Sequence, residues 1–263
     1  MINIIIPTFQ PDYYLLECLK SIQNQDFDFN NFSVTIILNG HKEPYYSQIK
    51  LWLKDFNFNF KLLYSESNGV SNARNLALDN TKAQFICFLD DDDILSTNYI
   101  SSLHDLANNK GIIVANTYNF LDNISKTQND YLTFTNEFSS KNLVKYRKYL
   151  SNACCKLIPM SIIGDNRFSP SLKKSEDAVF MFQISKNINS ITSTNPDVTY
   201  YRRLRPDSAS RKKYTFMSEI IEAYKIMISF SKVYFKSPAN YSFLLYLTRL
   251  LAVIKRVSLT LRN

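Results

Sequence analysis

Glycine is scarce in this sequence, with 4 glycines among 263 residues. Because glycine reaches backbone conformations that other residues avoid, each of the four is expected at a position that requires it. The stretch PTFQPDYY (residues 7–14), which follows the first predicted strand, contains none. This absence disfavours a glycine-rich phosphate-binding loop near the start of the chain.

Cysteine is also rare and poorly placed for cross-linking. The four cysteines are Cys18, Cys87, Cys154 and Cys155, and no two of them have the CxxC spacing of a zinc site. The adjacent pair is badly placed for a disulfide framework. The sequence therefore predicts reduced thiols that pack as small apolar groups in a cytoplasmic protein.

The chain lacks an uncharged apolar run of the roughly 20 residues that a membrane-spanning helix needs. Its apolar start, MINIII, has no basic leader and no small-residue cleavage site, so we expect no signal peptide. The segment 241–262 comes closest to a span, but Arg249 interrupts it. We expect this segment to be a helix that SPAN (residues 237–240) separates from the helix before it.

One broad side of that last helix is apolar, and we assign its basic residues to the opposite side. An interfacial helix on an anionic membrane fits this pattern, and the catalytic part of the chain should then fold without it. Docking on the protein's own core, or on a second copy in a homodimer, are the alternatives. The apolar side carries Phe243, Leu247, Leu250, Leu251, Ile254, Val257 and Leu261, and the basic side carries Arg249, Lys255, Arg256 and Arg262.

Apolar residues are plentiful: 45% of the chain is hydrophobic and 14% is aromatic, which is enough for a large core. The net charge of +8 is uneven, because 13 Lys and Arg face 3 Asp and Glu from Tyr200 onward, against 18 and 20 before it. This asymmetry indicates an anionic partner for the C-terminal part: phosphates, nucleic acid or an acidic membrane surface.

Short apolar runs alternate with helical patterns over the first 120 residues. This order predicts an α/β fold with a mainly parallel sheet and right-handed crossovers. The predicted strands are 2–6, 33–38, 61–65, 84–89 and 111–118, and the predicted helices are 12–25, a helix ending near residue 52, a helix after Gly69, and 97–108. Later the pattern is less regular, with strand-like pieces at 130–134, 152–158 and 197–204 and a helix at 175–187.

Four consecutive aspartates, Asp90 to Asp93, follow the apolar strand 84–89. Ligands of open α/β sheets bind at the carboxyl ends of the strands, where this run lies. Carboxylates in a D-x-D spacing point the same way and suit Mg²⁺ or Mn²⁺ together with substrate phosphates. A solvated turn that caps the next helix is the alternative interpretation.

Two further clusters carry possible chemistry. Glu176 and Asp177 open a predicted helix, where acidic residues either favour the helix dipole or supply a general base. The segment 199–213 contains Arg202, Arg203 and Arg205 before Ser208, which is typical either of a flexible loop that binds a diphosphate or of a basic surface loop.

Taken in order, five segments resemble family 2 glycosyltransferases of the GT-A fold, over residues 4 to about 210. They are IIIPTFQPDYYLLECLKSIQNQ, GVSNARNLAL, FICFLDDDDIL, SED and YYRRLRPDSAS. The resemblance implies a Rossmann-like GT-A fold at residues 1–212, with a nucleotide-binding half (1–118) and an acceptor half (119–212), and a helical extension at 213–263. It also implies an inverting, metal-dependent transfer from a nucleotide-sugar to a glycan acceptor, as in the synthesis of bacterial surface polysaccharides.

The resemblance implies a role for each matching residue. Asp92 and Asp90 would hold Mn²⁺ or Mg²⁺, with Asp91 or Asp93 in support, and Asp177 would be the base, beside Glu176. The donor would contact Pro7, Thr8, Asn39, Arg74, Asn75, Asp90, Asp91, Arg202, Arg205 and Ser208. Asn39 departs from the family, which usually has an acidic residue there. The Asn39 oxygen can accept from a uracil N3–H, but its NH₂ can donate to another base, so UDP is only the first choice.

Three other classes of protein fit the sequence less well. A nucleotidyltransferase that makes sugar nucleotides would have a glycine-rich loop, which PTFQPDYY is not. A non-catalytic nucleotide- or carbohydrate-binding module would not need both Asp92 and Asp177. A nucleic-acid binder would explain the basic tail but not the acidic run. The expected partners are therefore a nucleotide-sugar, a glycan or lipid-linked acceptor, and an anionic membrane at the inner face of the cytoplasmic membrane.

Overall fold

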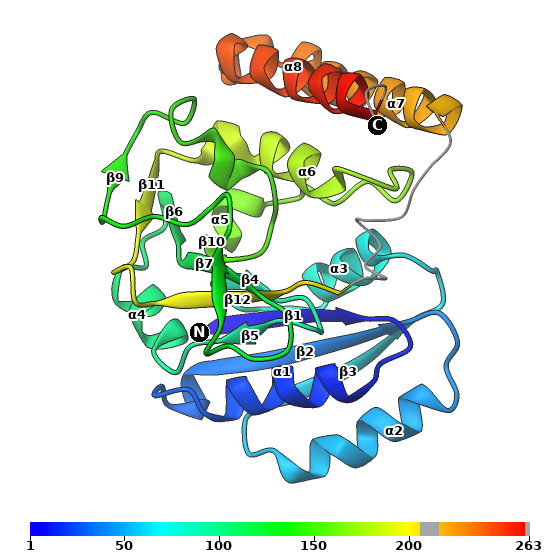
Figure 1. Cartoon of the computed structure of the whole chain (residues 1–263), viewed down its shortest axis with the longest axis vertical. Helices are drawn as coiled ribbons and strands as arrows, with labels where there is room; N and C mark the ends of the chain where they lie inside the picture. Colours follow the sequence, from blue (N-terminus) through cyan, green and yellow to red (C-terminus); the bar gives the residue numbers. More distant parts are fainter. Residues whose placement is uncertain (206–215, 261–263) are drawn as a thin grey trace.

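A central sheet of eight strands organises the protein, in the order β3-β2-β1-β4-β10-β6-β11-β9 (Figure 1). The computed structural model describes residues 1–205 and 216–260. The first four strands pair in parallel, as the sequence predicts. Nearly all side chains of β1, β2 and β4 are buried. These strands are β1 (Ile2–Thr8), β2 (Phe32–Asn39), β3 (Phe60–Ser65) and β4 (Phe85–Phe88).

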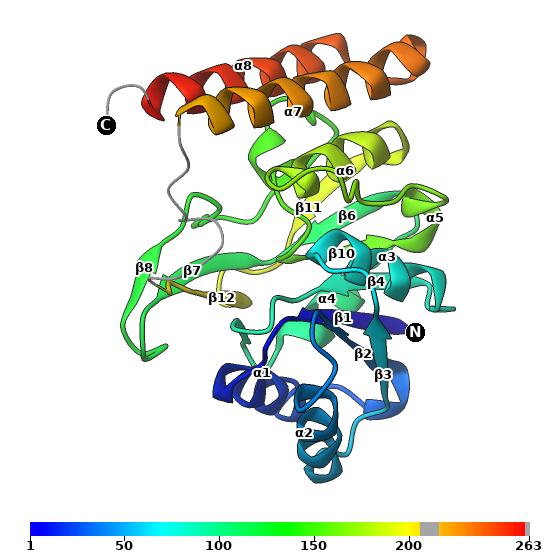
Figure 2. The ribbon, with the colours of Figure 1, turned by 90° about the vertical axis from the view of Figure 1, so that its right-hand side faces the viewer.

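Helices connect the parallel strands and cover the sheet (Figure 2). The first of them begins where the Asp12 carboxylate accepts a hydrogen bond from the Tyr14 N–H at 2.8 Å, and it buries Leu15, Cys18, Leu19 and Ile22. The helices are α1 (Tyr13–Gln23), α2 (Tyr45–Trp52), α3 (Val70–Asp79) and α4 (Tyr99–Asp105), with short 3₁₀ turns at η1 (Phe29–Asn31) and η2 (Leu53–Asp55). All four lie within the helical stretches predicted from the sequence.

The predicted strand 111–118 is in fact two strands in two different sheets. β6 (Gly111–Val114) belongs to the central sheet, whereas β7 (Asn116–Phe120) joins a second sheet in the order β5-β12-β7-β8. The other strands of this small sheet are β5 (Ile94–Leu95), β8 (Thr127–Asn129) and β12 (Thr199–Arg203). β5 follows the acidic run directly, so the small sheet fixes the acidic run against the 199–203 segment.

The later part of the chain completes the central sheet. β10 (Lys156–Pro159) runs antiparallel between β4 and β6, and β11 (Ser190–Ser193) and β9 (Ser139–Ser140) extend the edge. The predicted strand at 130–134 is wrong. Asp130 instead closes a turn, because its carboxylate accepts from the Leu132 N–H at 2.9 Å while its own N–H donates to Thr133 Oγ1 at 2.8 Å.

The cysteines behave as the sequence predicts. All four are free thiols and buried. Burial raises the pKa of the Cys87 thiol to about 12, so this thiol stays protonated and packs as an apolar group.

Two long helices form a hairpin that covers the end of the molecule beyond α6 (Figures 1 and 2). They are α7 (Phe216–Lys236) and α8 (Phe243–Thr260), separated by the 3₁₀ turn η6 (Pro238–Asn240) where the sequence predicts a break. The shorter elements before them are η3 (Arg147–Leu150), α5 (Met160–Ile163), α6 (Glu176–Ile184) and η4 (Ser185–Asn187). None of the helices in the described ranges is long and apolar enough to cross a membrane.

Arg249 lies on the inner side of α8, opposite the exposed Leu247, Leu251 and Ile254, as predicted for the basic and apolar sides of this helix. Arg249 is 6% exposed and donates to the Arg147 carbonyl at 3.0 Å, while Leu245, Tyr246 and Val253 on the same side are buried. The inner side of this helix is part of the core; that the catalytic part folds without α8 stays a prediction. Leu261 and Arg262 lie outside the described residues.

Candidate active site

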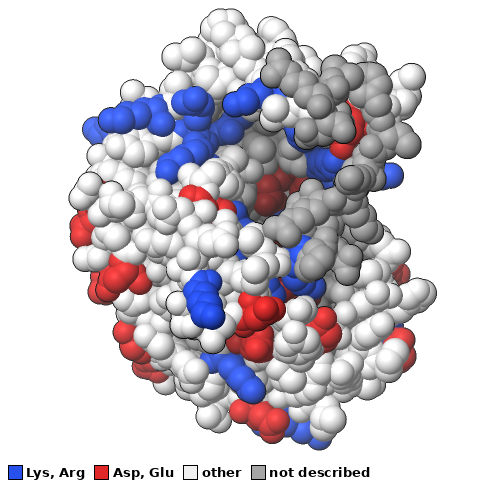
Figure 3. Space-filling model, viewed as in Figure 1, with Lys and Arg blue, Asp and Glu red and all other residues white. Residues whose placement is uncertain are grey.

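The acidic run lies at the carboxyl ends of β4 and β1, beside the first turn of α6. β1 ends at Thr8, β4 ends at Phe88, and Asp90 to Asp93 follow. Figure 3 shows acidic side chains in a hollow of the surface, with Lys and Arg side chains along its upper rim. The parallel pairing predicted from the sequence thus brings the expected loops to one edge of the sheet.

The four aspartates divide into two pairs that alternate along the chain. Asp91 and Asp93 are tied to neighbouring elements: Thr8 Oγ1 donates to Asp91 Oδ2 at 2.5 Å, and the Tyr200 hydroxyl and the Arg203 N–H donate to the Asp93 carboxylate at 2.6 and 2.8 Å. Burial raises the pKa of Asp91 to about 7 and that of Asp93 well above its usual value. These two residues therefore hold the run in place.

Asp90 and Asp92 make the other pair. The Asp90 side chain is 45% exposed and that of Asp92 is 12% exposed, so Asp90 is the more open carboxylate. Asp92 Oδ2 lies 2.6 Å from Arg205 Nε. Burial, followed by the negative charge of Asp90, raises the pKa of Asp92. The alternation expected for a D-x-D spacing is thus present.

Arg74 is the centre of the site. It lies on α3, its side chain is only 4% exposed, and its guanidinium bridges two carboxylates: Nη1 lies 2.5 Å from Asp177 Oδ1, and Nη2 lies 3.0 Å from Asp90 Oδ1. Glu176 Oε1 is 3.7 Å from the same Nη1. A buried guanidinium needs such partners, since an unpaired charge in the interior is costly. Arg74 therefore joins the acidic run to the two acids of α6.

Asp177 is held at both of its oxygens. Oδ1 accepts from Arg74, and Oδ2 accepts from the Ala153 N–H at 3.2 Å. Glu176 lies in the same helical turn; burial, followed by the charge of Asp177, raises the pKa of Glu176 to about 7. The two adjacent acids thus differ in environment, and Asp177 is the one that is fixed in orientation.

A buried lysine shapes the turn that contacts Asp177. Lys156 is 1% exposed, and its ammonium donates to the Asn152 carbonyl, the Asn152 side-chain oxygen and the Cys154 carbonyl at 2.8, 2.7 and 2.5 Å. The residue between these acceptors is Ala153, whose N–H bonds to Asp177. Burial lowers the pKa of Lys156 to about 8. Because β10 is antiparallel to β4, this turn lies at the same edge as the acidic run.

The structure brings several of the other predicted donor-binding residues close to this edge. Pro7 and Thr8 end β1, and Asn39 ends β2, where its Nδ2 donates to the Thr8 carbonyl at 2.8 Å and its Oδ1 accepts from the Gly69 N–H at 3.2 Å. One acceptor lone pair and one N–H of Asn39 remain beyond these two bonds. Gly69 has φ +110°, a conformation that side chains rarely adopt, and α3 begins directly after it.

Other predicted residues are engaged elsewhere. Both polar atoms of the Asn75 amide bond to the backbone of Phe168, at 2.9 and 2.8 Å, so Asn75 anchors that segment. Arg202 pairs with Asp130 at 2.7 Å. Ser208 lies outside the described residues. Residues 199–203 form strand β12, which confirms the strand-like piece predicted at 197–204; residues 206–213 of the predicted basic loop lie outside the described residues.

Arg203 lies in strand β12 and is buried, so it is not part of a flexible basic loop. It is 7% exposed, its Nε donates to the Asp92 carbonyl at 2.9 Å, and its Nη2 lies 2.5 Å from Glu17. Sequence reasoning also missed Tyr200, Ala153 and Lys156. No local motif marks these positions.

The donor set fits a divalent cation that is shared with a substrate. In residues 1–205 and 216–260, no group of three His, Cys, Asp or Glu side chains is arranged to hold a metal ion. Two carboxylates, Asp90 and Asp92, are nevertheless available, and Mg²⁺ typically binds through one or two carboxylates plus phosphate and water oxygens. These residues therefore suit a cation that arrives with a diphosphate.

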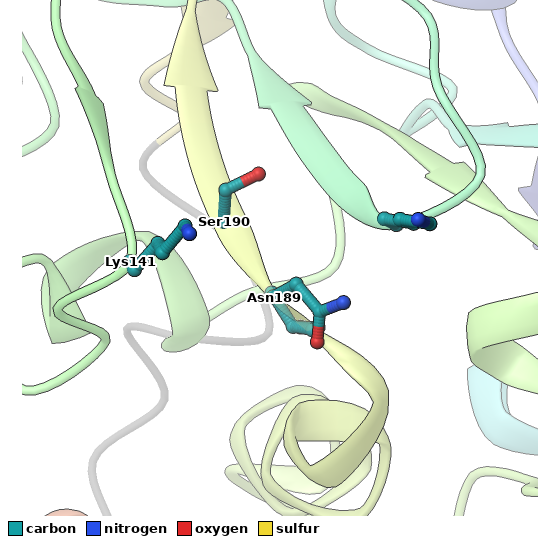
Figure 4. Close-up of a pocket in the computed structure, with 5 residues that line it drawn as sticks. Lys141, Asn189 and Ser190 are labelled. Atoms are coloured by element: carbon teal, nitrogen blue, oxygen red, sulfur yellow. The ribbon is translucent and has the colours of Figure 1, made fainter.

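A second hollow lies at the opposite edge of the central sheet. Lys110, Lys141, Ile188, Asn189 and Ser190 line it, and Figure 4 labels three of them. Ser190 begins β11 and Lys110 precedes β6, so the hollow is at the amino ends of these strands. It is separate from the acidic run and contains no acidic side chain among its lining residues.

The sequence pattern of glycosyl transferase family 2 matches residues 3–165. The chain belongs to this family. Among solved structures, that of TarS residues 1–349 from S. aureus in complex with UDP-GlcNAc superposes with a TM-score of 0.75 at 17% identity, covering 97% of this chain and 72% of that one. This likeness confirms the GT-A fold. The mannosyltransferase PcManGT from Pyrobaculum calidifontis, in complex with GDP-Man and Mn²⁺, gives 0.63 at 14% identity, covering 99% and 74%.

Two similar curated proteins have names that refer to teichoic acid biosynthesis and to poly(ribitol-phosphate). The minor teichoic acid biosynthesis protein GgaB of Bacillus subtilis is 28% identical over 79% of this chain. The poly(ribitol-phosphate) beta-N-acetylglucosaminyltransferase TarS of Staphylococcus aureus is 22% identical over 86%. This chain spans only 23% and 39% of the lengths of these two relatives. Neither the nucleotidyltransferase nor the non-catalytic alternative gains support from these similarities.

Proposed function

We propose that this chain transfers a sugar from a nucleotide-sugar to a hydroxyl of a glycan acceptor, with inversion at the anomeric carbon. One observation carries the proposal: the buried Arg74 joins Asp177, the expected base, to Asp90 of the acidic run. Family membership supports the same reaction class. UDP is the first choice of nucleotide, because the TarS structure of the same fold is a complex with UDP-GlcNAc.

Asp177 is the general base of the proposed reaction. Its carboxylate takes the proton of the acceptor hydroxyl while the hydroxyl oxygen bonds to the anomeric carbon, and the bond from that carbon to the diphosphate breaks on the opposite face. Arg74 and the Ala153 N–H hold the carboxylate in one orientation. Such fixed placement reduces the entropy that the reaction must otherwise lose.

The leaving diphosphate needs compensation for its negative charge. A divalent cation held by Asp92 and Asp90 would supply electrostatic stabilisation of that charge. Arg205, which lies against Asp92, together with Arg202 and Ser208, is proposed to contact the diphosphate. Pro7, Thr8 and Asn39 at the ends of β1 and β2 are proposed to contact the nucleoside.

The acceptor is proposed to be a phosphate-containing polymer of the bacterial surface, reached at the inner face of the cytoplasmic membrane. The names of GgaB and TarS point to such polymers. The segment 141–148 adds support from the chain itself, because it contains Lys141, Lys145, Arg147 and Lys148 and no acidic residue. Basic side chains of this kind attract a polyanion over a distance.

Thermal unfolding tests the donor site directly. UDP-GlcNAc is added to the protein with and without Mn²⁺, and the change in melting temperature is compared between the parent, Asp92→Asn and the surface control Asp122→Asn. We expect Mn²⁺ to enlarge the shift in the parent and in the control but not in Asp92→Asn. An equal Mn²⁺-dependent shift in all three proteins would contradict the assignment of Asp92.

A further inference from the structure

The outer side of the α7–α8 hairpin is an unusually apolar surface. Eleven of the twenty large hydrophobic side chains that are exposed in the described residues lie on these two helices. We call them the apolar outer face. They are Met217, Ile220, Ile221, Tyr224 and Phe235 on α7, and Phe243, Leu244, Leu247, Leu251, Ile254 and Leu259 on α8. Patches of this kind on a soluble fold mark contact sites rather than chance.

The charges around this face are of one sign. Four lysines, Lys225, Lys232, Lys236 and Lys255, are exposed on the two helices. The two acidic residues of 216–260, Glu219 and Glu222, are 5% and 8% exposed and so contribute little to the surface. On a helical projection at 100° per residue, the lysines flank the apolar stripes on the sides away from the partner helix. Exposed lysines thus flank the apolar outer face.

The arginines of α8, in contrast, face the protein. Arg249 donates to the Arg147 carbonyl, and Arg256 Nη1 donates to Ser175 Oγ at 3.0 Å. Ser175 directly precedes Glu176 and Asp177. The inner side of the hairpin is therefore fixed to the segment that begins the catalytic helix, and Tyr234 and Tyr246 stack between α7 and α8 at 4.5 Å.

We propose that the apolar outer face docks on the surface of an anionic membrane. Apolar side chains with flanking lysines match a lipid interface, where the chains enter the acyl boundary and the ammonium groups remain at the phosphate level. Lysines in this position gain from the negative surface potential of the lipids. Both helices form the surface, so it is larger than the single C-terminal segment that the sequence indicates.

The same charges disfavour a second copy of the chain as the occupant. A symmetric dimer through this face would bring the flanking lysines of both copies to one contact, with the two acidic residues of the hairpin buried. An anionic lipid surface supplies the opposite charge. The proposed transfer reaction is not needed for this inference, although docking here would bring the Ser175–Asp177 segment near a lipid-linked acceptor.

Sedimentation with lipid vesicles tests the proposal. The full chain is mixed with phosphatidylcholine vesicles that contain or lack phosphatidylglycerol. One variant changes the apolar outer face (Leu247→Ser, Leu251→Ser and Ile254→Ser), and another changes the lysines (Lys225→Gln, Lys232→Gln and Lys236→Gln). Matched controls lie on the β1–β3 half at the other end of the molecule: Leu51→Ser, and Lys20→Gln with Lys54→Gln and Lys61→Gln.

We expect the parent and both controls to bind the vesicles that contain phosphatidylglycerol. Loss of one lysine should weaken binding roughly fivefold, and the triple lysine variant on the order of a hundredfold. The triple serine variant should lose at least about tenfold. Equal binding by outer-face variants and controls would overturn the proposal. A parent that fails to bind the vesicles would also overturn the proposal. This holds if the parent is monomeric, and it holds if the parent is a dimer that the serine changes convert to a monomer.

A donor measurement separates this result from the transfer reaction. The Mn²⁺-dependent thermal shift with UDP-GlcNAc should be the same in the parent and the outer-face variants, since none of these residues touches the acidic run. A loss of both vesicle binding and donor binding in the triple serine variant would indicate that the hairpin had misfolded. The lysine variant, which leaves every apolar side chain of the hairpin unchanged, then tests the proposal by itself.

Discussion

Replacing Arg74 with methionine should destabilise the protein strongly and in a pH-dependent way. Methionine removes the guanidinium, whose carbon lies 5.9 and 5.3 Å from the ring centres of Phe88 and Phe168, and leaves Asp177 and Asp90 without their common cation. Removing one partner of a buried ion pair typically costs about 3–5 kcal/mol, because the remaining charge is left in the interior. We expect a loss of that size in the free energy of unfolding at pH 8, measured with urea.

The pH dependence has a definite sign. Arg74 lowers the pKa of Glu176, so its removal raises that pKa further above the value of the unfolded chain. A carboxyl group that binds its proton more tightly in the folded than in the unfolded chain makes the folded protein less stable as pH rises. The loss in the free energy of unfolding caused by Arg74→Met should therefore grow from pH 5 to pH 8. The free energy of unfolding of Arg74→Lys should lie between those of the parent and Arg74→Met, because an ammonium restores the charge but cannot contact both carboxylates with two separate nitrogens.

A surface pair provides the control. Arg167 lies 2.7 Å from Asp79, but the two side chains are 30% and 55% exposed. Arg167→Met should therefore cost at most about 1 kcal/mol and show no growth with pH. If Arg74→Met costs no more than Arg167→Met, or if its deficit is the same at pH 5 and pH 8, the central position given to Arg74 is wrong.

Two further predictions follow from groups with shifted pKa values. Because the pKa of Glu176 is raised to about 7, the contribution of this residue to stability falls as pH rises from about 4.5 to 7. Glu176→Gln should therefore be more stable than the parent at pH 8, and the two should be equally stable near pH 4. Urea unfolding measures this difference. Because the pKa of Lys156 is lowered to about 8, the unfolded chain binds more protons than the folded chain between pH 8 and 10. The free energy of unfolding of the parent should thus contain a rising component in that range that Lys156→Met lacks; parallel pH profiles would contradict it.

Much of the site could be predicted from the sequence because it is made of local patterns at strand ends. The division of Asp90 and Asp92 from Asp91 and Asp93 agrees with the expectation for a D-x-D spacing, although the run forms a turn in which the Asp93 N–H donates to the Asp90 carbonyl at 3.2 Å. The position of Glu176 and Asp177 in a first helical turn follows from the apolar pattern of 178–184. The parallel pairing of β1, β2 and β4 then brings the acidic run to the same edge as the ends of β1 and β2 without any knowledge of contacts.

What the sequence could not show depends on partners that are distant along the chain. Asp93 bonds to Tyr200, 107 residues away, and Arg203 bonds to Glu17, 186 residues away. An arginine-rich segment has the same composition whether it is a flexible loop or a buried strand such as β12. Likewise, Arg249 interrupts an apolar segment in the sequence, but only the position of the Arg147 carbonyl decides that it faces inward.

The most direct test of the account is the rate at which Asp177→Asn releases UDP from UDP-GlcNAc with Mn²⁺ in the presence of poly(ribitol phosphate). Asparagine keeps the size of the side chain and removes its basicity, so we expect donor binding to persist while turnover falls by roughly 10²-fold or more. The exposed control Asp165→Asn should match the parent. Near-normal turnover by Asp177→Asn, with a parent that is active, would contradict the assignment of Asp177 as the base.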